Sequence, residues 1–162
     1  MLHEALDACA GMGVNVEIKN SPGDLGDEGS DNGLEVADLV VSLVTQRDAG
    51  QPIQISSFDE PTLARVKELA PALPTAQLLF DLHSDPEAVD RAAAAGHEAI
   101  NPWDPFVDEA LCARCAELGL EINPWTVDDP DRIRALAALG VTGIITNTPA
   151  AALAALGLAE TG

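Results

Sequence analysis

The chain has 162 residues, 47% of them hydrophobic, and its 27 acidic side chains against 8 basic ones give a formal net charge of −19. This length and composition predict one globular domain with a sizeable core and exclude a disordered chain. The negative charge argues against nucleic acid and anionic membranes as partners. Because no apolar run has membrane-spanning length and the first residues lack signal-peptide features, we expect no membrane insertion.

Three cysteines, Cys9, Cys112 and Cys115, bear on the compartment of the protein. An odd number of thiols without a secretion signal favours reduced cysteines and a cytoplasmic location. Cys112 and Cys115 form a CxxC pair inside a helical pattern, where a spacing of three places both sulfurs on one helix face. We expect them to pack as small apolar residues; a metal or redox role is the alternative.

Apolar strand patterns alternate with amphipathic helix patterns along the whole chain. A capping residue before proline marks helix starts at Asp59, Ser84–Asp85 and Asp129, and glycines such as Gly119 mark helix ends. The expected strands are 13–19, 53–58, 77–82, 99–103, 120–127 and 143–147, and the expected helices lie near 34–48, 59–70, 86–95, 106–118, 130–139 and 149–156. This alternation predicts a parallel sheet with helices outside it.

The later βα units are close to a true repeat, because INPW occurs at 100–103 and again at 122–125. Near-equal units without a dinucleotide-type GxGxxG motif favour a (β/α)8 TIM barrel over a doubly wound sheet. A complete barrel usually needs about 200–250 residues. We therefore expect residues 1–162 to form a single, incomplete barrel domain with about six of the eight βα units.

Two charges interrupt the first strand pattern, GVNVEIKN at 13–20. Since strand side chains alternate, Val14, Val16 and Ile18 share one face, and the opposite face carries Glu17 and Lys19. One interpretation is an edge strand with a solvated outer face. The other is a barrel strand whose charged side chains project into a functional site.

In a (β/α) barrel, site residues gather at the carboxyl ends of the strands. Those positions hold Glu17, Lys19, Ser56, Ser57, Phe80, Asp81, Asn101, Trp103, Asn123, Trp125, Thr146 and Asn147. A carboxylate suits a hard divalent cation, a lysine suits a phosphate oxygen, and an indole can line an organic substrate. Ser56, Ser57 and Trp103 could equally be packing residues of the barrel interior.

Four segments resemble the glycerophosphodiester phosphodiesterases over essentially the whole chain: NVEIKN at 15–20, ISSFD at 55–59, INPW at 100–103 and WTVDDPDRIRALAALGVTGIITNTP at 125–149. The resemblance implies a TIM barrel that hydrolyses glycerophosphodiesters to an alcohol and glycerol 3-phosphate with Ca²⁺ or Mg²⁺. It also implies that Glu17 is a metal ligand, that Lys19 lies by the substrate phosphate, and that Trp125 lines the pocket.

The chain departs from that family where the catalytic groups are expected. The family's His-Arg-Gly strand, Glu-x-Asp metal pair and His-Asp motif do not occur in it, and residues 1–13 resemble the helix before the NVEIK strand. The first two βα units are thus expected to be missing. Of the histidines present, His3 is expected to be exposed on a helix, His83 to lie in a loop that could border the site, and His97 to lie at the opposite strand end. No pair replaces the family's general acid and base.

The acidic, glycine-rich segment 20–33 resembles the variable loop that follows the metal-ligand strand in the family. Its acids do not follow the EF-hand spacing. We expect a mobile, solvated, lid-like loop; a dedicated cation site is the alternative.

The leading hypothesis is an incomplete phosphodiesterase of this family that acts on a small-molecule glycerophosphodiester and is weak or inactive by itself. The rival is a non-catalytic barrel fragment for binding or assembly, whose open side a second copy or a completing chain would cover. A different phosphate-handling barrel enzyme is a weaker candidate, since no glycine-rich phosphate loop follows Val127 or Asn147.

Overall fold

A computed structural model of the protein describes residues 1–19, 32–47 and 50–158. The chain divides into two units, Met1–Leu78 and Leu79–Gly162, which are taken separately below. The predicted lid-like loop falls almost entirely within 20–31 and so lies outside the described residues. That the chain is a single barrel domain stays a prediction.

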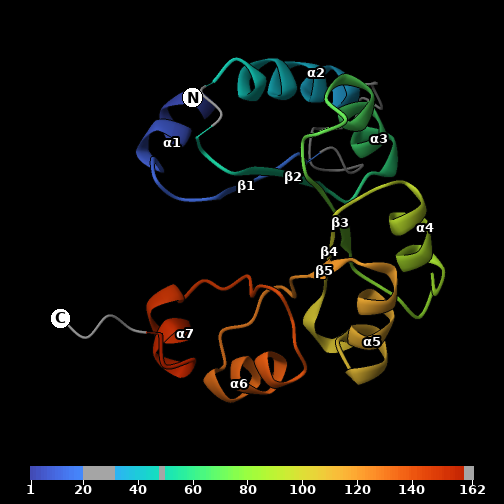
Figure 1. Ribbon diagram of the computed structural model, residues 1–162, viewed down its shortest axis with the longest axis vertical. Helices are drawn as coiled ribbons and strands as arrows, with labels where there is room; N and C mark the ends of the chain where they lie inside the picture. Colours follow the sequence, from blue (N-terminus) through green and yellow to red (C-terminus); the bar gives the residue numbers. More distant parts are fainter. Residues whose placement is uncertain (20–31, 48–49, 159–162) are drawn as a thin grey trace. The chain divides into compact units, whose positions relative to one another are not determined.

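The first unit alternates helices and strands as predicted (Figure 1). Its strands pair in parallel and in chain order, with Glu17 opposite Ser56 and Ser57 opposite Gln77. In order, its elements are α1 (Leu2–Ala8), β1 (Val14–Glu17), α2 (Asn32–Thr45), β2 (Ile53–Ser57), α3 (Glu60–Leu69) and β3 (Thr75–Leu79), whose last residue begins the second unit.

Helix α3 shows how local sequence builds this unit. The Asp59 carboxylate accepts a hydrogen bond from the Thr62 backbone N–H (2.9 Å), and Pro61 occupies the first turn, as the sequence predicts. Leu63 and Val66 are fully buried on the face of α3 that joins a cluster with Ile55 of β2. Helix α2 packs beside α3.

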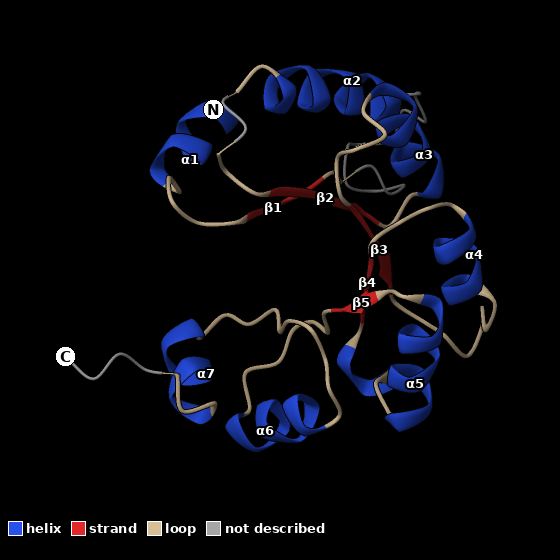
Figure 2. Ribbon diagram, in the orientation of Figure 1, coloured by secondary structure: helices blue, strands red, loops and turns tan. Residues whose placement is uncertain are grey.

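The second unit continues the same alternation (Figure 2). Its elements are α4 (Ala88–Ala94), β4 (Ala99–Pro102), a 3₁₀ turn η1 (Asp104–Phe106), α5 (Glu109–Leu118), β5 (Glu121–Ile122), α6 (Pro130–Ala138) and α7 (Pro149–Ala155). β4 and β5 are parallel, with Ile100 opposite Ile122, so the two INPW repeats are neighbours in register. This confirms that the repeat reflects two equivalent βα units.

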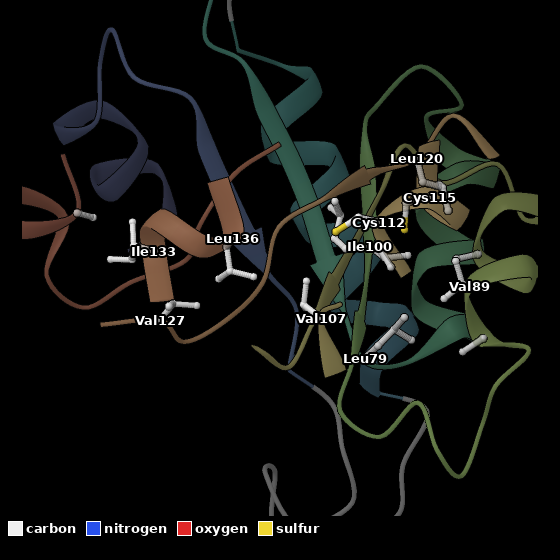
Figure 3. Close-up of a cluster of buried hydrophobic side chains, with 14 residues drawn as sticks. Leu79, Val89, Ile100, Val107, Cys112, Cys115, Leu120, Val127, Ile133 and Leu136 are labelled. Atoms are coloured by element: carbon white, nitrogen blue, oxygen red, sulfur yellow. The ribbon is translucent and has the colours of Figure 1, made fainter. Parts of the chain in front are cut away.

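The core of the second unit lies between its strands and helices (Figure 3). Ile100, Ile133 and Leu136 are fully buried in it. Cys112 and Cys115 are buried there as free thiols, and burial raises the pKa of the Cys115 thiol to about 11. A thiol in this state is protonated at neutral pH, which supports the packing role and not the redox or metal role.

Several predicted elements need correction. β3 covers 75–79 instead of 77–82, so Phe80 and Asp81 follow the strand. β5 is limited to two residues although 120–127 was expected to be a strand. The Trp125 N–H still donates to the Pro102 carbonyl (3.0 Å), but Pro124 has no N–H to donate toward residues 143–147. Residues 143–147 are not a strand, although the Val127 N–H still donates to the Ile145 carbonyl (2.9 Å).

The start of α4 also differs from the prediction. The Asp85 carboxylate does not cap this helix but pairs with Arg91, whose guanidinium lowers the pKa of Asp85. The helix begins instead after Glu87, which makes no side-chain cap bond. By contrast, Asp129 caps α6 through the backbone N–H groups of Asp131 and Arg132, as predicted. Gly119 ends α5 in the left-handed conformation (φ 71°) that glycine adopts easily.

Within the described ranges, no helix is long and apolar enough to cross a membrane.

Candidate functional site

The end of β1 holds the two charged residues that the sequence singles out. Val14 and Val16 pack against the apolar cluster of the first unit, whereas Glu17 lies in register with Ser56 of β2. On that same face the Asn15 side-chain amide donates to the Ser56 hydroxyl oxygen (2.9 Å). The alternation predicted for GVNVEIKN is therefore confirmed, with an apolar face toward the helices and a polar face opposite.

Glu17 and Lys19 are brought together but only loosely. The Lys19 Nζ lies 4.0 Å from Glu17 Oε1, with the lysine side chain 66% exposed and the glutamate side chain 35% exposed. An exposed pair at this distance contributes little to stability. Both groups are thus free to bind a ligand without a large loss of folding energy.

Ser56, opposite Glu17 on β2, and its neighbour Ser57 both have hydrogen-bond partners within the fold. Ser57 is fully buried, and its hydroxyl donates to the Ile18 carbonyl (2.9 Å). The side-chain amide of Gln77 donates to the Phe58 carbonyl (3.0 Å), and its own Oε1 is buried without a hydrogen-bond partner. Ser57 therefore fixes the chain after β1 to β2, which is a packing role.

A divalent cation is not accommodated by the described residues alone. Ca²⁺ takes six to eight oxygen ligands, and Mg²⁺ demands an octahedral set. In the part of the chain that the structure describes, no three acidic, histidine or cysteine side chains come together as a metal cluster. Glu17 can supply one carboxylate ligand, so these residues do not fit a complete metal site.

Trp125 belongs to the second unit and is tightly anchored there. Its indole Nε1 donates to the Asn101 carbonyl (2.8 Å), and its backbone N–H donates to the Pro102 carbonyl (3.0 Å). Asn101 is buried, and its side-chain oxygen accepts a bond from the Asn123 amide (3.1 Å). The two INPW motifs are thus bonded to each other, and the Asn101 carbonyl holds the indole of Trp125.

Aromatic rings gather around Trp125 at the ends of β3 and β4. The rings of Phe80 and Trp103 stack with centroids 5.0 Å apart and an interplanar angle of 7°. The ring centroid of Phe80 also lies 6.2 Å from that of Trp125, and the ring centroid of Phe106 lies 5.9 Å from that of Trp103. We call Phe80, Trp103 and Trp125 the aromatic row. Trp103 is 36% exposed, so it lies at the protein surface and is not an interior packing residue.

Two acidic residues hold the loops beside the row. Asp104 pairs with Arg132 (2.7 Å), and the same guanidinium donates to the carbonyls of Asp104 and Val107. Asp128 accepts bonds from the Asn147 side chain, the Thr146 hydroxyl and the Asn147 backbone N–H, and these bonds lower the pKa of Asp128. Neither role was predicted from the sequence, although Arg132, which pairs with Asp104, and Asn147, which bonds Asp128, lie in the motifs DDPDR (128–132) and TNT (146–148).

The three histidines lie on different elements. His3 is exposed on α1, His83 is exposed in the loop before α4, and His97 is buried in the turn before β4. The His83 ring makes an edge contact with Phe106 at 4.8 Å, so it borders the aromatic cluster. His97 sits at the amino-terminal end of β4, as predicted.

Both units show the parallel βα order of an α/β barrel; the charged residues lie at a strand end of the first unit, and the aromatic row lies at strand ends of the second. The profile of the glycerophosphoryl diester phosphodiesterase family matches residues 1–151 of this chain. The chain therefore belongs to that family.

Relatives and solved structures agree with this assignment. A glycerophosphodiester phosphodiesterase of Caldanaerobacter subterraneus is 26% identical over 140 residues, covering 84% of this chain and 52% of its own. A crystal structure from Silicibacter pomeroyi, provisionally named a glycerophosphoryl diester phosphodiesterase, is 29% identical with a TM-score of 0.83, over 99% of this chain and 58% of that one.

An Oleispira antarctica phosphodiesterase, solved with its product sn-glycerol-3-phosphate, has a TM-score of 0.76 at 18% identity over 90% of this chain and 55% of its own. These likenesses confirm the incomplete TIM-barrel fold class. The chain spans about half the length of the curated relatives that it matches.

Proposed function

We propose that this chain carries part of a site for metal-dependent hydrolysis of glycerophosphodiesters to an alcohol and glycerol 3-phosphate. Family membership over residues 1–151 supports the reaction class. The observation that carries the proposal is the pair of opposite charges at the end of β1, Glu17 and Lys19, on the polar face of the sheet. A related phosphodiesterase with sn-glycerol-3-phosphate bound supports a small-molecule phosphate ligand.

Each candidate residue has a proposed role. Lys19 places a positive charge against a phosphate oxygen, and Trp125 offers its indole as a wall for the organic part of the substrate. Glu17 is proposed as one oxygen ligand for Ca²⁺ or Mg²⁺. Because the described residues do not complete a metal site, no step of the reaction is assigned to the ion.

We expect the chain alone to hydrolyse its substrate weakly or not at all. Positioned acid–base groups each contribute about 10²–10⁴-fold to a rate. This sequence has no match to the family's His-Arg-Gly and His-Asp motifs, which supply the general acid and base, so we expect that contribution to be absent. Turnover of glycerophosphocholine at an ordinary enzyme rate of about 1–10³ per second would overturn this expectation while supporting the reaction class.

Binding of the product tests the proposed site independently of turnover. Glycerol 3-phosphate with Ca²⁺ or Mg²⁺ is expected to raise the melting temperature by about 5–11 °C at a concentration of 100 Kd, because a ligand that binds only the folded state stabilises it by about 2.7 kcal/mol. Differential scanning fluorimetry measures the shift, with glycerol as the uncharged control ligand.

Two variants locate the binding. Lys19→Met and Glu17→Gln are expected to remove most of the shift, whereas Lys67→Met, which alters the only other lysine, is expected to keep it. Equal shifts in all three variants, or no shift in the wild-type chain, would contradict the assignment of Glu17 and Lys19.

The second candidate is a non-catalytic barrel fragment that acts in binding or assembly. What supports it is that this sequence has no match to the family's His-Arg-Gly and His-Asp motifs. On this reading the chain pairs with a second copy or with a completing chain. Light scattering separates the two readings: a well-folded monomer argues against completion by a partner, and a defined dimer favours assembly.

A further inference from the structure

Two hydrogen bonds hold the backbone between Glu17 and Lys19. The regular pairing of β1 with β2 ends at Glu17, and Lys19 lies beyond it. Between them, the Ile18 N–H donates to the Ser56 carbonyl (2.8 Å), and the Ile18 carbonyl accepts a bond from the Ser57 hydroxyl (2.9 Å). Because the Ile18 carbonyl and the Lys19 N–H belong to one planar peptide unit, the Ser57 bond fixes the direction in which Lys19 leaves β1.

The Ser57 hydroxyl has a defined orientation. Its oxygen also accepts a bond from the backbone N–H of Asp59 (3.1 Å), the residue that caps α3, so its proton is directed to the Ile18 carbonyl. Ser57 is fully buried and Ile18 is 3% exposed, so water does not compete for either group. A single hydroxyl therefore joins the end of β1 to the start of α3.

Gln77 of β3 holds the backbone of Ser57 in turn. Its side-chain Nε2 donates to the carbonyls of Ser57 (3.3 Å) and Phe58 (3.0 Å), while its own Oε1 is buried without a hydrogen-bond partner. Buried polar atoms are usually paired. Turning the amide round would set its oxygen against these carbonyls, so the unpaired Oε1 is a consequence of holding the end of β2. We call Gln77 and Ser57 the hydrogen-bond relay.

The hydrogen-bond relay supports the candidate site from the opposite face of the sheet. Ser56 lies opposite Glu17 in register, whereas Ser57 lies opposite Gln77. Because strand side chains alternate, the relay is on the face of β2 that points away from Glu17. The Ser57 side chain is packed inside the fold, and it acts on the site through the Ile18 carbonyl instead of through a ligand.

We propose that Ser57, held by Gln77, is a positioning residue for Glu17 and Lys19, because it fixes the segment that carries the ammonium group. A lysine on a fixed backbone gives up less conformational freedom when it meets an anion than a lysine on a loose one, so it binds the anion more tightly. That the anion is the phosphate of a glycerophosphodiester rests on the proposed function. The ordering of the backbone at Lys19 does not.

Backbone order at Lys19 tests the proposal without any ligand. The chain has only two lysines, so labelling with ¹⁵N-lysine gives two backbone amide signals, and Lys67 within α3 is the internal reference. In the wild-type chain both amides are expected to show an order parameter of about 0.85 in ¹⁵N relaxation. In Ser57→Ala the value for Lys19 is expected to fall below about 0.6, while that for Lys67 stays unchanged.

Two further variants separate positioning from stability. Val41→Ala removes buried apolar volume from the cluster that contains Ile18, and it is expected to lower the melting temperature while leaving the order parameter of Lys19 unchanged. Ser57→Cys keeps the size of the side chain but offers only a weak S–H donor, so it decides if Ser57→Ala fails to fold. A wild-type value for Lys19 below about 0.6, or an equal fall in Val41→Ala, would overturn the proposal.

Binding of glycerol 3-phosphate distinguishes this proposal from the proposed function. With Ca²⁺ or Mg²⁺ present, Ser57→Ala is expected to bind it about 3–10-fold more weakly than the wild-type chain. Loss of order at Lys19 in Ser57→Ala, together with no binding by the wild-type chain, would support the positioning role and count against the phosphodiesterase site. Wild-type binding that Ser57→Ala retains in full, with the order at Lys19 unchanged, would support the site and overturn the positioning role.

Discussion

Replacing Leu136 with alanine is expected to lower the free energy of unfolding by about 2–5 kcal/mol, a large share of the 5–15 kcal/mol typical of a folded domain. Leu136 lies on α6, is fully buried, and belongs to the same core cluster as Ile133, Val127 and Ile122. Truncation loses the transfer free energy of the side chain and leaves a cavity that the surroundings fill only partly. Urea unfolding followed by tryptophan emission measures the change.

A matched leucine provides the control for this prediction. Leu153 lies on the next helix, α7, and is 46% exposed. Its replacement by alanine is expected to change the free energy of unfolding by about 0.5 kcal/mol, because exposed substitutions rarely disturb a core. If both variants lose the same stability, the core of the second unit is not where the structure places it.

Structural features that depend on a few residues close together in the sequence were predictable. The cap of α3 by Asp59 and the cap of α6 by Asp129 need only a capping carboxylate followed by proline. The parallel register of Ile100 and Ile122 follows from the spacing of the INPW repeat. The end of β5 was harder to predict, because the apolar pattern of 120–127 and single backbone hydrogen bonds continue past Pro124, whereas the regular strand ends at Ile122.

The candidate site was predictable as a set of positions but not as an arrangement. Alternation along β1 places Glu17 and Lys19 on the polar face, as the structure confirms. Phe80 and Trp103 could each be assigned to a strand end, yet nothing in the sequence states that their rings stack. Ring stacking depends on the side-chain rotamers and on the backbone that follows each strand, which are properties of the folded chain. The metal and substrate roles of Glu17, Lys19 and Trp125 stay predictions.

The guanidinium of Arg132 shows how a residue far along the chain can support the aromatic row. From α6 it donates 2.7 Å to the Asp104 carboxylate and to two carbonyls, those of Asp104 and Val107. The arginine side chain is 32% exposed and the aspartate side chain 21% exposed, so water screens this pair only in part. These three bonds fix the η1 turn, which begins directly after Trp103.

Replacing Arg132 with alanine is therefore expected to lower the free energy of unfolding by about 1.5–3 kcal/mol, because a carboxylate and two carbonyls lose a charged donor. The near-ultraviolet circular dichroism of the tryptophans is expected to weaken as the turn after Trp103 loosens. The stability of Arg132→Lys is expected to lie between that of the wild-type chain and that of Arg132→Ala, since an ammonium cannot reproduce the planar fork of a guanidinium.

Arg134 on the same helix is the matched control. Among the described residues it pairs with Asp131 on the surface, with side chains 53% and 90% exposed, so Arg134→Ala is expected to lower the free energy of unfolding by about 0–1 kcal/mol. It is also expected to leave the tryptophan spectrum unchanged. If Arg134→Ala lowers the free energy of unfolding as much as Arg132→Ala does, the loss of a positive charge from α6 explains both losses of stability. If Arg132→Ala destabilises the fold but leaves the spectrum intact, Arg132 supports the core without positioning the aromatic row.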